Sequence, residues 1–225
     1  INEDEDPQNA YNNALQKAKD IINAVPDGTL DKATVEQILT ELQQAKDALH
    51  GEQKLQEAKE QANVQIDKLD ALNPGQVLAE KTLINQAQTR PAVQEALQKA
   101  KELNDVMKAL RSGLAKKDQV KGESKYINAD SSKQTTYDNA LNLGSQIITT
   151  TQPPELDKDV INSATQSITN AENDLNGQVK LTEAVTNGNQ EIDNLHGLTQ
   201  AQKDKENESI KQAPTVAQVT DIINN

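Results

Sequence analysis

The sequence predicts an all-α protein made of tandem three-helix bundles, which long shared helices join into an extended rod. Three observations support this fold class. Apolar residues recur at helical spacing along most of the 225 residues. The aromatic residues are three Tyr, with no Phe or Trp, so the core must consist of small aliphatic side chains, which suit closely packed helices better than sheets. The sequence also repeats internally, which indicates units stacked end to end.

The repeat has an offset of 126 residues, the separation of Tyr11 and Tyr137. Tyr11-Asn-Asn-Ala-Leu15 returns as Tyr137-Asp-Asn-Ala-Leu141, and no insertion or deletion breaks the register downstream. Further pairs at this offset are Leu30 with Leu156, Ala45 with Ala171, Leu49 with Leu175, Gly51 with Gly177, Leu55 with Leu181, Ile66 with Ile192, Leu69 with Leu195, Ile84 with Ile210 and Val93 with Val219.

The first predicted helix covers residues 7–25, with Pro7 at its first position. It is followed by the turn Pro26-Asp27-Gly28. Its apolar stripe is Tyr11, Ala14, Leu15, Ala18, Ile21, Ile22 and Val25.

A second, long helix is predicted over residues 31–73, and its apolar face reverses at Gly51. The stripe before Gly51 lies within roughly 60° of Leu42, and the stripe after it lies on the opposite side. The alternative is that Gly51 ends one helix and another begins at about Gln53. We favour one continuous helix because no capping residue follows Gly51, and a glycine inside a helix costs only about 1 kcal/mol. The two stripes are Val35, Ile38, Leu42, Ala45 and Leu49, and then Leu55, Ala58, Ala62, Ile66 and Leu69.

Two more helices complete the unit, over residues 75–88 and 91–117, and residues 116–136 form a polar joint. The third helix is expected to bury Val77, Leu83, Ile84 and Ala87, and the fourth to bury Val93, Leu97, Ala100, Leu103, Val106, Met107, Leu110 and Leu114. In the second unit the expected helices are 132–150, 157–197, 200–213 and one that starts at Thr215.

Bulk composition excludes several classes of function. The net charge of −12 disfavours nucleic acid and anionic membranes as partners. There is no cysteine, which excludes thiol chemistry. No apolar run is long enough to span a membrane, so an export signal or anchor is expected outside this segment.

No constellation of catalytic or metal-ligating residues is recognisable, so we expect no enzyme activity, no cofactor and no metal site. His50 and His196 do not recur between units and are interpreted as surface residues. The acidic stretch Asn2–Asp6 lacks the glycine and the glutamate of a calcium loop and is interpreted as a solvated joint. Asp67 and Asp193 do recur, and a capping or inter-helix hydrogen bond is expected for them. The sequence assigns no individual ligand-binding residue, so these residues are unknown.

Residues 55–110 resemble a GA module, the three-helix type named for bacterial albumin-binding domains. The residues that carry this resemblance include Leu55-Gln-Glu-Ala-Lys59, Ile66-Asp67-Lys68-Leu69 and Ala100-Lys-Glu-Leu103. Tyr11-Asn-Asn-Ala-Leu15 and Leu49-His-Gly51 are similar to a FIVAR module. The alternation of both modules at this period resembles the repeat regions of giant staphylococcal matrix-binding surface proteins.

The resemblance divides the chain into four parts. Residues 1–50 are FIVAR-like helices of an incomplete bundle, and residues 51–117 a GA-like bundle. Residues 118–176 are a FIVAR-like bundle that takes its third helix from about 103–120, and residues 177–225 are a GA-like bundle with a truncated last helix.

The resemblance further implies a segment of an extracellular, cell-surface adhesin, anchored through parts outside this chain. It would act as an extended, monomeric stalk that binds fibronectin multivalently and serves attachment and biofilm formation. The alternative is a mechanical spacer that supports envelope integrity and osmotic-stress resistance without a host ligand. Albumin binding is disfavoured because the face around Lys81, Thr82, Gln86 and Gln88 changes between units, where Asn207 and Glu208 replace Lys81 and Thr82.

Overall fold

The computed structural model describes residues 1–24 and 31–224, and these residues form helices, turns and loops without a β-strand. The chain divides into two compact units. Unit 1 comprises Ile1–Asp70 and Val77–Lys101, and unit 2 comprises Ala71–Gln76 and Glu102–Asn225. The predicted all-α class is confirmed. The rod-like arrangement of the units stays a prediction, which small-angle scattering tests.

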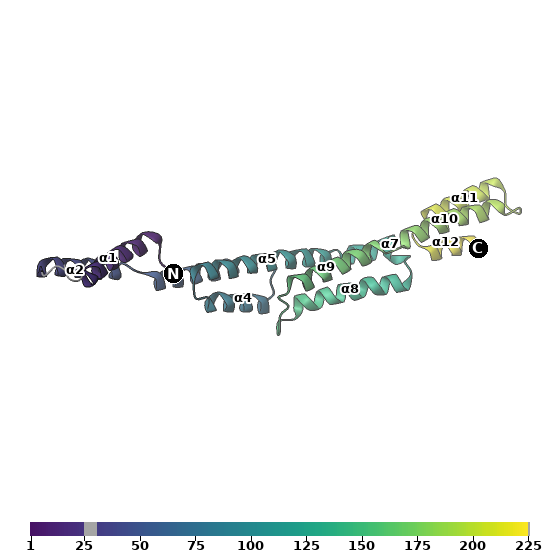
Figure 1. Cartoon of the computed structure of the whole chain (residues 1–225). Helices are drawn as coiled ribbons and strands as arrows, with labels where there is room; N and C mark the ends of the chain where they lie inside the picture. The colour runs from purple at the N-terminus through teal and green to yellow at the C-terminus, as the bar shows by residue number, and fades with distance from the viewer. Residues whose placement is uncertain (25–30, 225) are drawn as a thin grey trace. The chain divides into compact units, whose positions relative to one another are not determined.

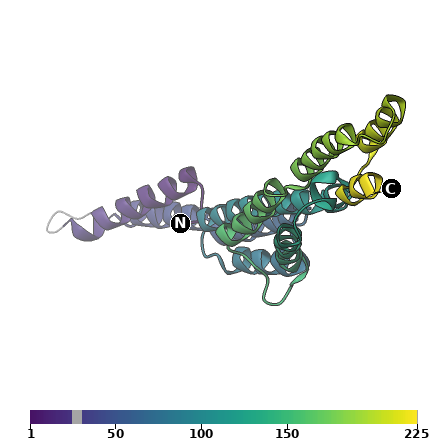
Figure 2. The ribbon, with the colours of Figure 1, turned by 90° about the vertical axis from the view of Figure 1, so that its right-hand side faces the viewer.

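Unit 1 begins with a helical hairpin of α1 (Glu5–Asn23) and α2 (Lys32–Asp47), which lie side by side in Figures 1 and 2. Pro7 is the third residue of α1 instead of the predicted first. It is tolerated there because the first N–H groups of a helix have no partner within the helix. Val25 and the turn Pro26-Asp27-Gly28 lie outside the described residues.

The helix predicted over residues 31–73 is two helices, which corrects the sequence analysis. After α2, a short connection of Ala48, Leu49 and His50 leads into α3 (Gly51–Ile66). Unit 2 repeats this break between α9 (Lys158–Asn173) and α10 (Gly177–Asn194). Gly51 and Gly177 each start the second helix, so neither proposed role, inside a helix or ending one, is right.

The sequence predicted one continuous helix because no local capping residue follows Gly51. In the structure, a residue distant in the sequence contacts the start of the second helix instead. The backbone N–H of His50 donates to the Glu3 carboxylate, 47 residues away in the sequence. In unit 2, the Asn176 side chain accepts a bond of 3.1 Å from the Asp130 N–H. A helix start that depends on tertiary contacts carries no local sequence signal.

Two further helices complete the first three-helix bundle with α3. They are α4 (Pro74–Gln86) and the first half of α5 (Arg90–Ala115), which continues without a break into unit 2. The core of this bundle is Ala62, Ile66, Ile84, Val93, Leu97 and Ala100. Leu83, predicted to be buried, is 46% exposed. The buried stripe of α4 includes Glu80 one turn before Ile84 and Gln76 two turns before it, and the polarity of these two residues hid the stripe from the hydrophobic pattern.

Unit 2 contains two bundles. In the first, the second half of α5 packs against α8 (Ser131–Thr149) and α9, and the predicted polar joint contains the short helices α6 (Lys117–Gly122) and α7 (Ser124–Ile127). The second combines α10 with α11 (Gln200–Gln212) and α12 (Val216–Asn224), seen at the yellow end of Figure 1. The core of this last bundle is Leu181, Ile192, Ile210, Ala213 and Val219.

Candidate functional site

Each unit contains a polar cluster where a FIVAR-like hairpin segment meets the following bundle, and we call it the joint clamp. It consists of Asn2, Asp4 and Lys54 in unit 1, and of Asn128, Asp130 and Lys180 in unit 2, pairwise 126 residues apart. The asparagine side chain spans the loop between the second and third helices of the bundle. In unit 1 it donates to the Gln88 carbonyl at 3.2 Å and accepts from the Arg90 N–H at 2.9 Å.

Asn128 makes the same pair of bonds in unit 2. Its amide donates to the Pro214 carbonyl at 3.2 Å and accepts from the Val216 N–H at 2.8 Å. Because both bonds use backbone groups of the bundle, the side chains of that loop are free to change between units while the clamp persists. Asn2 and Glu3 therefore make fixed contacts at the joint, whereas Asp4, Glu5 and Asp6 are exposed, in agreement with the interpretation of a solvated joint.

The second part of the clamp is an ion pair. Lys54 lies 2.7 Å from Asp4, and Lys180 lies 2.6 Å from Asp130. In unit 1, Glu3 also binds Lys54, and Arg90 lies 2.7 Å from Asp4. The Lys54 ammonium group lowers the pKa of Glu3 to about 2, and hydrogen bonds from Lys54 and then Arg90 lower the pKa of Asp4. Lys180 likewise lowers the pKa of Asp130.

The glycine at the start of the second helix lets the clamp segment pass close to it. A Cβ on Gly177 would lie 2.4 Å from the Ser124 carbonyl oxygen and 2.6 Å from the Ala129 nitrogen. A Cβ on Gly51 would lie 3.2 Å from the Glu3 nitrogen. At Gly177 only the missing side chain permits this approach, whereas at Gly51 the neighbouring backbone would have to move by a few tenths of an ångström.

A second joint lies within unit 2, where the loop 71–76 meets the connection between α8 and α9. The Asn73 amide donates to the carbonyls of Ile147 at 3.2 Å and Thr150 at 3.0 Å, and the Gln76 amide donates to Glu155 at 2.7 Å. The counterpart of Asn73 is Thr199, which forms a capping box with Gln202 and has no amide with which to make such bonds.

The recurring aspartates contact the neighbouring helix, as expected. Asp67 pairs with Lys81 at 2.6 Å, and Asp193 accepts from Asn207 at 2.9 Å. Asn207 is the counterpart of Lys81. Lys81 and Asn207 therefore make the same kind of inter-helix contact, although the difference between them is one of the changes that disfavour a shared albumin-binding face. His50 and His196 are exposed, and among the described residues no cluster of three or more His, Asp or Glu side chains is arranged to hold a metal ion.

The face proposed for albumin binding carries exposed apolar residues in unit 1 only. Leu78 is 65% exposed and Leu83 46% exposed on α4, beside the exposed Thr82 and Gln86. Their counterparts in unit 2 are Asp204 and Ser209. This surface therefore differs between the two repeats.

An apolar groove runs between α8 and α9 and has a volume of about 590 Å³. Leu143 and Val160 line it and are 50% and 43% exposed, and Pro153 and Pro154 close one end. This groove and the α4 face are two exposed apolar surfaces on which a ligand could bind.

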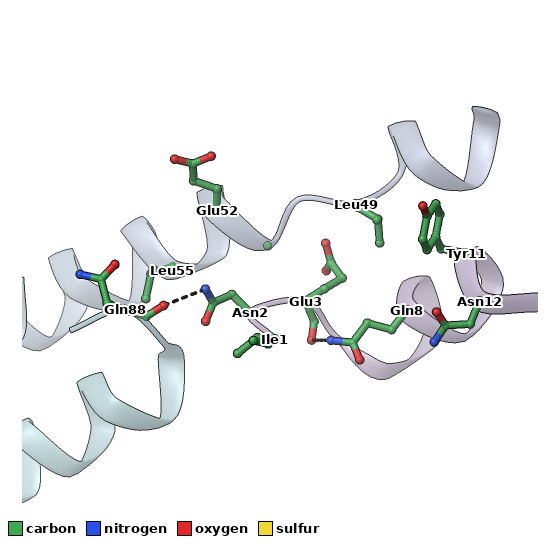
Figure 3. A pocket seen from close by; sticks show the side chains of 11 residues that line it. Ile1, Asn2, Glu3, Gln8, Tyr11, Asn12, Leu49, Glu52, Leu55 and Gln88 are labelled. Atoms are coloured by element: carbon green, nitrogen blue, oxygen red, sulfur yellow. Dashed lines mark hydrogen bonds between the residues drawn. The ribbon is translucent and has the colours of Figure 1, made fainter. Parts of the chain in front are cut away.

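A pocket of about 670 Å³ lies beside the joint clamp of unit 1. Figure 3 shows Tyr11 of α1 and Leu49 next to one another at one end, while Gln8 donates to the Glu3 carbonyl at 3.1 Å. The pocket is further lined by Ile1, Asn2, Asn12, Gly51, Glu52, Leu55 and Gln88.

A buried carboxylic acid lies in the first three-helix bundle. Glu80 is 5% exposed, and its Oε2 atom has no hydrogen-bond partner among the described residues. Burial raises its pKa, against the opposing effect of the Lys99 ammonium group.

Sequence reasoning did not find the joint clamp, although a signal was present. Asn2, Asp4 and Lys54 are polar residues that recur unchanged at the repeat offset. Residues 2–6 contain four acidic residues and residues 128–132 contain one, so the difference in charge conceals the recurring identities.

Two family models match the chain. One described as the FIVAR domain matches residues 1–50 and 106–176, and one described as the GA module matches residues 52–106 and 178–225. No described helix is long and apolar enough to cross a membrane.

Curated relatives come from Staphylococcus aureus. The extracellular matrix-binding protein EbhA of strain Newman is 40% identical over 219 residues, which make up 97% of this chain and 6% of that protein. The extracellular matrix-binding protein ebh of strain NCTC 8325 / PS 47 is also 40% identical, over 97% of this chain and 2% of its own length. The chain thus spans a small fraction of these relatives.

Two solved structures are also similar. The 756–1003 domain of EbhA from Staphylococcus aureus has a TM-score of 0.86 and 31% identity, and the match covers 99% of this chain and 89% of that one. The second comes from a characterization of Staphylococcus epidermidis adherence to fibronectin mediated by the extracellular matrix-binding protein Embp. Its TM-score is 0.54 with 37% identity, over 55% of this chain and 98% of that one.

Proposed function

Since this chain belongs to the family of staphylococcal FIVAR- and GA-module repeats, we propose that it is a segment of a surface adhesin that binds fibronectin in the host extracellular matrix. The proposal is supported by the names of the curated relatives, which are called extracellular matrix-binding proteins. The observation that carries the proposal is the recurrence of both modules with the same joint clamp. The two modules and the clamp recur once per 126 residues, and such a repeated arrangement suits multivalent attachment.

The exposed surface favours weak binding by each repeat. Tight protein interfaces are usually anchored by Trp, Tyr or Arg. Here Tyr137 is fully buried, Tyr126 and Tyr11 are partly buried, and Trp is absent. The exposed large apolar residues are aliphatic and are spread over several helices, and they include Leu78 and Leu83 on α4 and Leu143 and Val160 in the α8–α9 groove. We therefore expect a dissociation constant in the micromolar range or weaker for this two-repeat chain.

Binding to immobilised fibronectin tests the proposal, with this chain compared against arrays of several copies in series. Arrays should dissociate more slowly because neighbouring repeats raise the effective concentration. Albumin and peptidoglycan serve as comparison ligands, each at low and physiological salt. If one copy binds as tightly as an array, or if neither binds at high surface density, the adhesin proposal fails and the mechanical spacer replaces it.

Two variants then locate the contact. Leu78→Asp places a charge on the α4 face, and Leu143→Asp places one in the α8–α9 groove. Both side chains are at least half exposed, so the bundles should remain folded. Loss of fibronectin binding in one variant and not in the other assigns the surface.

A further inference from the structure

The connection before α10 contains a pair of residues that can react with each other. Two Asn-Gly pairs occur in the chain, Asn176-Gly177 and Asn187-Gly188. In such a pair the backbone nitrogen of the glycine can attack the side-chain carbon of the asparagine, because glycine has no side chain to hinder the approach. Asparagine is for this reason one of the thermolabile residues of proteins. The counterpart of Asn176 in unit 1 is His50, which has no side-chain amide and lacks this chemistry.

Asn176 is bound to the joint clamp of unit 2 through both polar atoms of its side chain. Its Nδ2 atom donates to Asp130 Oδ2 at 2.7 Å, and its Oδ1 atom accepts from the Asp130 N–H at 3.1 Å. Lys180 donates to the other carboxylate oxygen of Asp130 at 2.6 Å. The clamp therefore fixes the orientation of the Asn176 amide.

The closed joint also keeps the two reacting atoms apart. Asn176 has φ of −104° and ψ of 7°, so the Gly177 nitrogen nearly eclipses the Asn176 backbone nitrogen. Ring closure requires rotation about the Cα–C bond until the Gly177 nitrogen eclipses the Asn176 Cβ atom instead. The packing of Gly177 opposes this rotation, because a Cβ on it would lie 2.6 Å from both the Ala129 nitrogen and the Lys125 carbonyl oxygen. The reaction therefore requires the joint to open.

We propose that Asn176-Gly177 is a site of spontaneous deamidation that the joint clamp of unit 2 controls, and that the product holds this joint open. The Gly177 nitrogen forms a bond to the Asn176 Cγ atom and gives up its proton, and the side-chain nitrogen leaves as ammonia. Water then opens the five-membered ring at either of its carbonyls, which leaves aspartate or isoaspartate in place of Asn176. The net change converts an amide into a carboxyl group and consumes water, without an enzyme or a cofactor.

Both products weaken the clamp. Each replaces the Nδ2 donor of Asn176 by a carboxylate beside the Asp130 carboxylate, and the two like charges repel each other. Isoaspartate also lengthens the main chain by one carbon, at the residue whose carbonyl accepts the Lys180 N–H at 3.1 Å in the first turn of α10. The joint of unit 2 therefore loosens as the protein ages, whereas the joint of unit 1 cannot change in this way. The site does not depend on which matrix ligand the repeats bind.

The experiment incubates the full chain at neutral pH and follows deamidation at Asn176 and Asn187 by mass spectrometry. Deamidation of Asn176 should be at least about tenfold slower in the folded chain than in the chain unfolded by urea, because only the open fraction of molecules reacts. Asp130→Ala and Lys180→Met should each raise the rate at Asn176 and leave the rate at Asn187 unchanged. Asp4→Ala, in the joint clamp of unit 1, is the matched control and should change neither rate.

The deamidated fraction is then separated by ion exchange and compared with the unreacted fraction by amide hydrogen exchange. Exchange of residues 124–130 and of the first turn of α10 should be faster by at least about tenfold after deamidation. Asn176→Asp introduces the charge without the longer main chain and should give a smaller acceleration.

Three results overturn the proposal. They are equal rates at Asn176 in the folded and the unfolded chain, no selective rise at Asn176 in either clamp variant, and equal hydrogen exchange at the joint in the two fractions. A rise at Asn187 as large as that at Asn176 in both clamp variants counts as the second result, because unfolding of α10 and not opening of the joint would then set the rate.

Discussion

The α1–α2 and α8–α9 hairpins have the same apolar pattern and yet bury different amounts of it. Leu15 and Leu141 are the same residue at the same register position, but only Leu141 is almost fully buried. The difference arises from α5, which lies over Gly144 and Ile168 in unit 2. Amphipathic periodicity therefore predicts which face of a helix can be buried. Whether that face is buried depends on the neighbouring element that packs against it.

Substitution of the glycines at the start of α3 and α10 tests the joints of the two hairpins. It should give the largest change in the free energy of unfolding. Gly177→Ala places a Cβ within 2.4–2.6 Å of backbone atoms of Ser124, Lys125 and Ala129, which have no flexible end to move. We expect a loss of about 2 kcal/mol or more in the free energy of unfolding of unit 2. Gly51→Ala meets its nearest backbone atom at 3.2 Å and should cost at most about 1 kcal/mol.

Thermal unfolding followed by circular dichroism, with hydrogen exchange of α3 and α10, measures both variants. Sequence reasoning alone predicts that Gly51→Ala is neutral or stabilising, because alanine favours a helix interior. Equal and small effects of the two substitutions would show that the close backbone approach at Gly177 does not constrain the joint.

A matched pair of leucines tests the covered and uncovered faces directly. Leu141→Ala removes a side chain that is 3% exposed and should destabilise unit 2 by about 2–4 kcal/mol. Leu15→Ala, on the uncovered hairpin, should cost about 1 kcal/mol or less. Local hydrogen exchange in α8 and in α1 separates the two losses. Similar losses at both positions would mean that α1–α2 is covered in solution.

Most of the fold could be predicted from the sequence, because helix existence depends on local periodicity. The fourth helix illustrates this, since Val93, Leu97, Ala100, Leu103, Met107 and Leu110 are all buried as expected. The break before Gly51 was only the alternative interpretation of the sequence, because the Glu3 carboxylate that accepts from the His50 N–H is far away in the sequence. The joint clamp leaves a signal in the recurrence of its residues, but its partners could not be predicted, since Asn2 and Asn128 bind backbone groups of another loop.

Glu80 and its counterpart Glu206 provide a test in the GA-like bundles. Burial raises the pKa of Glu80 above its ordinary value of 4.5. As the pH rises above 4.5, the unfolded chain loses this proton before the folded chain does, so the free energy of unfolding falls until the pH passes the folded pKa. Glu80→Gln should therefore stabilise unit 1 at pH 7 and have little effect at pH 4.

Glu206, which is only partly buried, provides the control. Glu206→Gln should change the stability of unit 2 less than Glu80→Gln changes that of unit 1, and chemical denaturation at pH 4 and pH 7 measures both. A destabilising Glu80→Gln at pH 7 would mean that the carboxylate has a partner in solution.

The smallest expected effect is a loss of stability in acid, which distinguishes the two joint clamps because Glu3 is present only in unit 1. The Lys54 ammonium group lowers the pKa of Glu3 to about 2 from an ordinary value of 4.5, whereas the counterpart of Glu3 is Ala129. A depressed pKa contributes stability that is complete above pH 4.5 and is lost as the pH falls toward 2. Unit 1 should thus lose the stability that Glu3 contributes as the pH falls. Unit 2 should not show this particular loss, because alanine stands at the position of Glu3.

A carboxyl-detected NMR titration measures the pKa of Glu3 directly. Lys54→Met should return it toward 4.5, because the hydrogen bond from Lys54 is the largest cause of the shift. Lys180→Met is the matched variant in unit 2, where the pKa of Asp130 should rise for the same reason. If Lys54→Met leaves the pKa of Glu3 near 2, the backbone N–H groups of Asp4 and His50 hold the carboxylate, and the ion pair does not fix this joint.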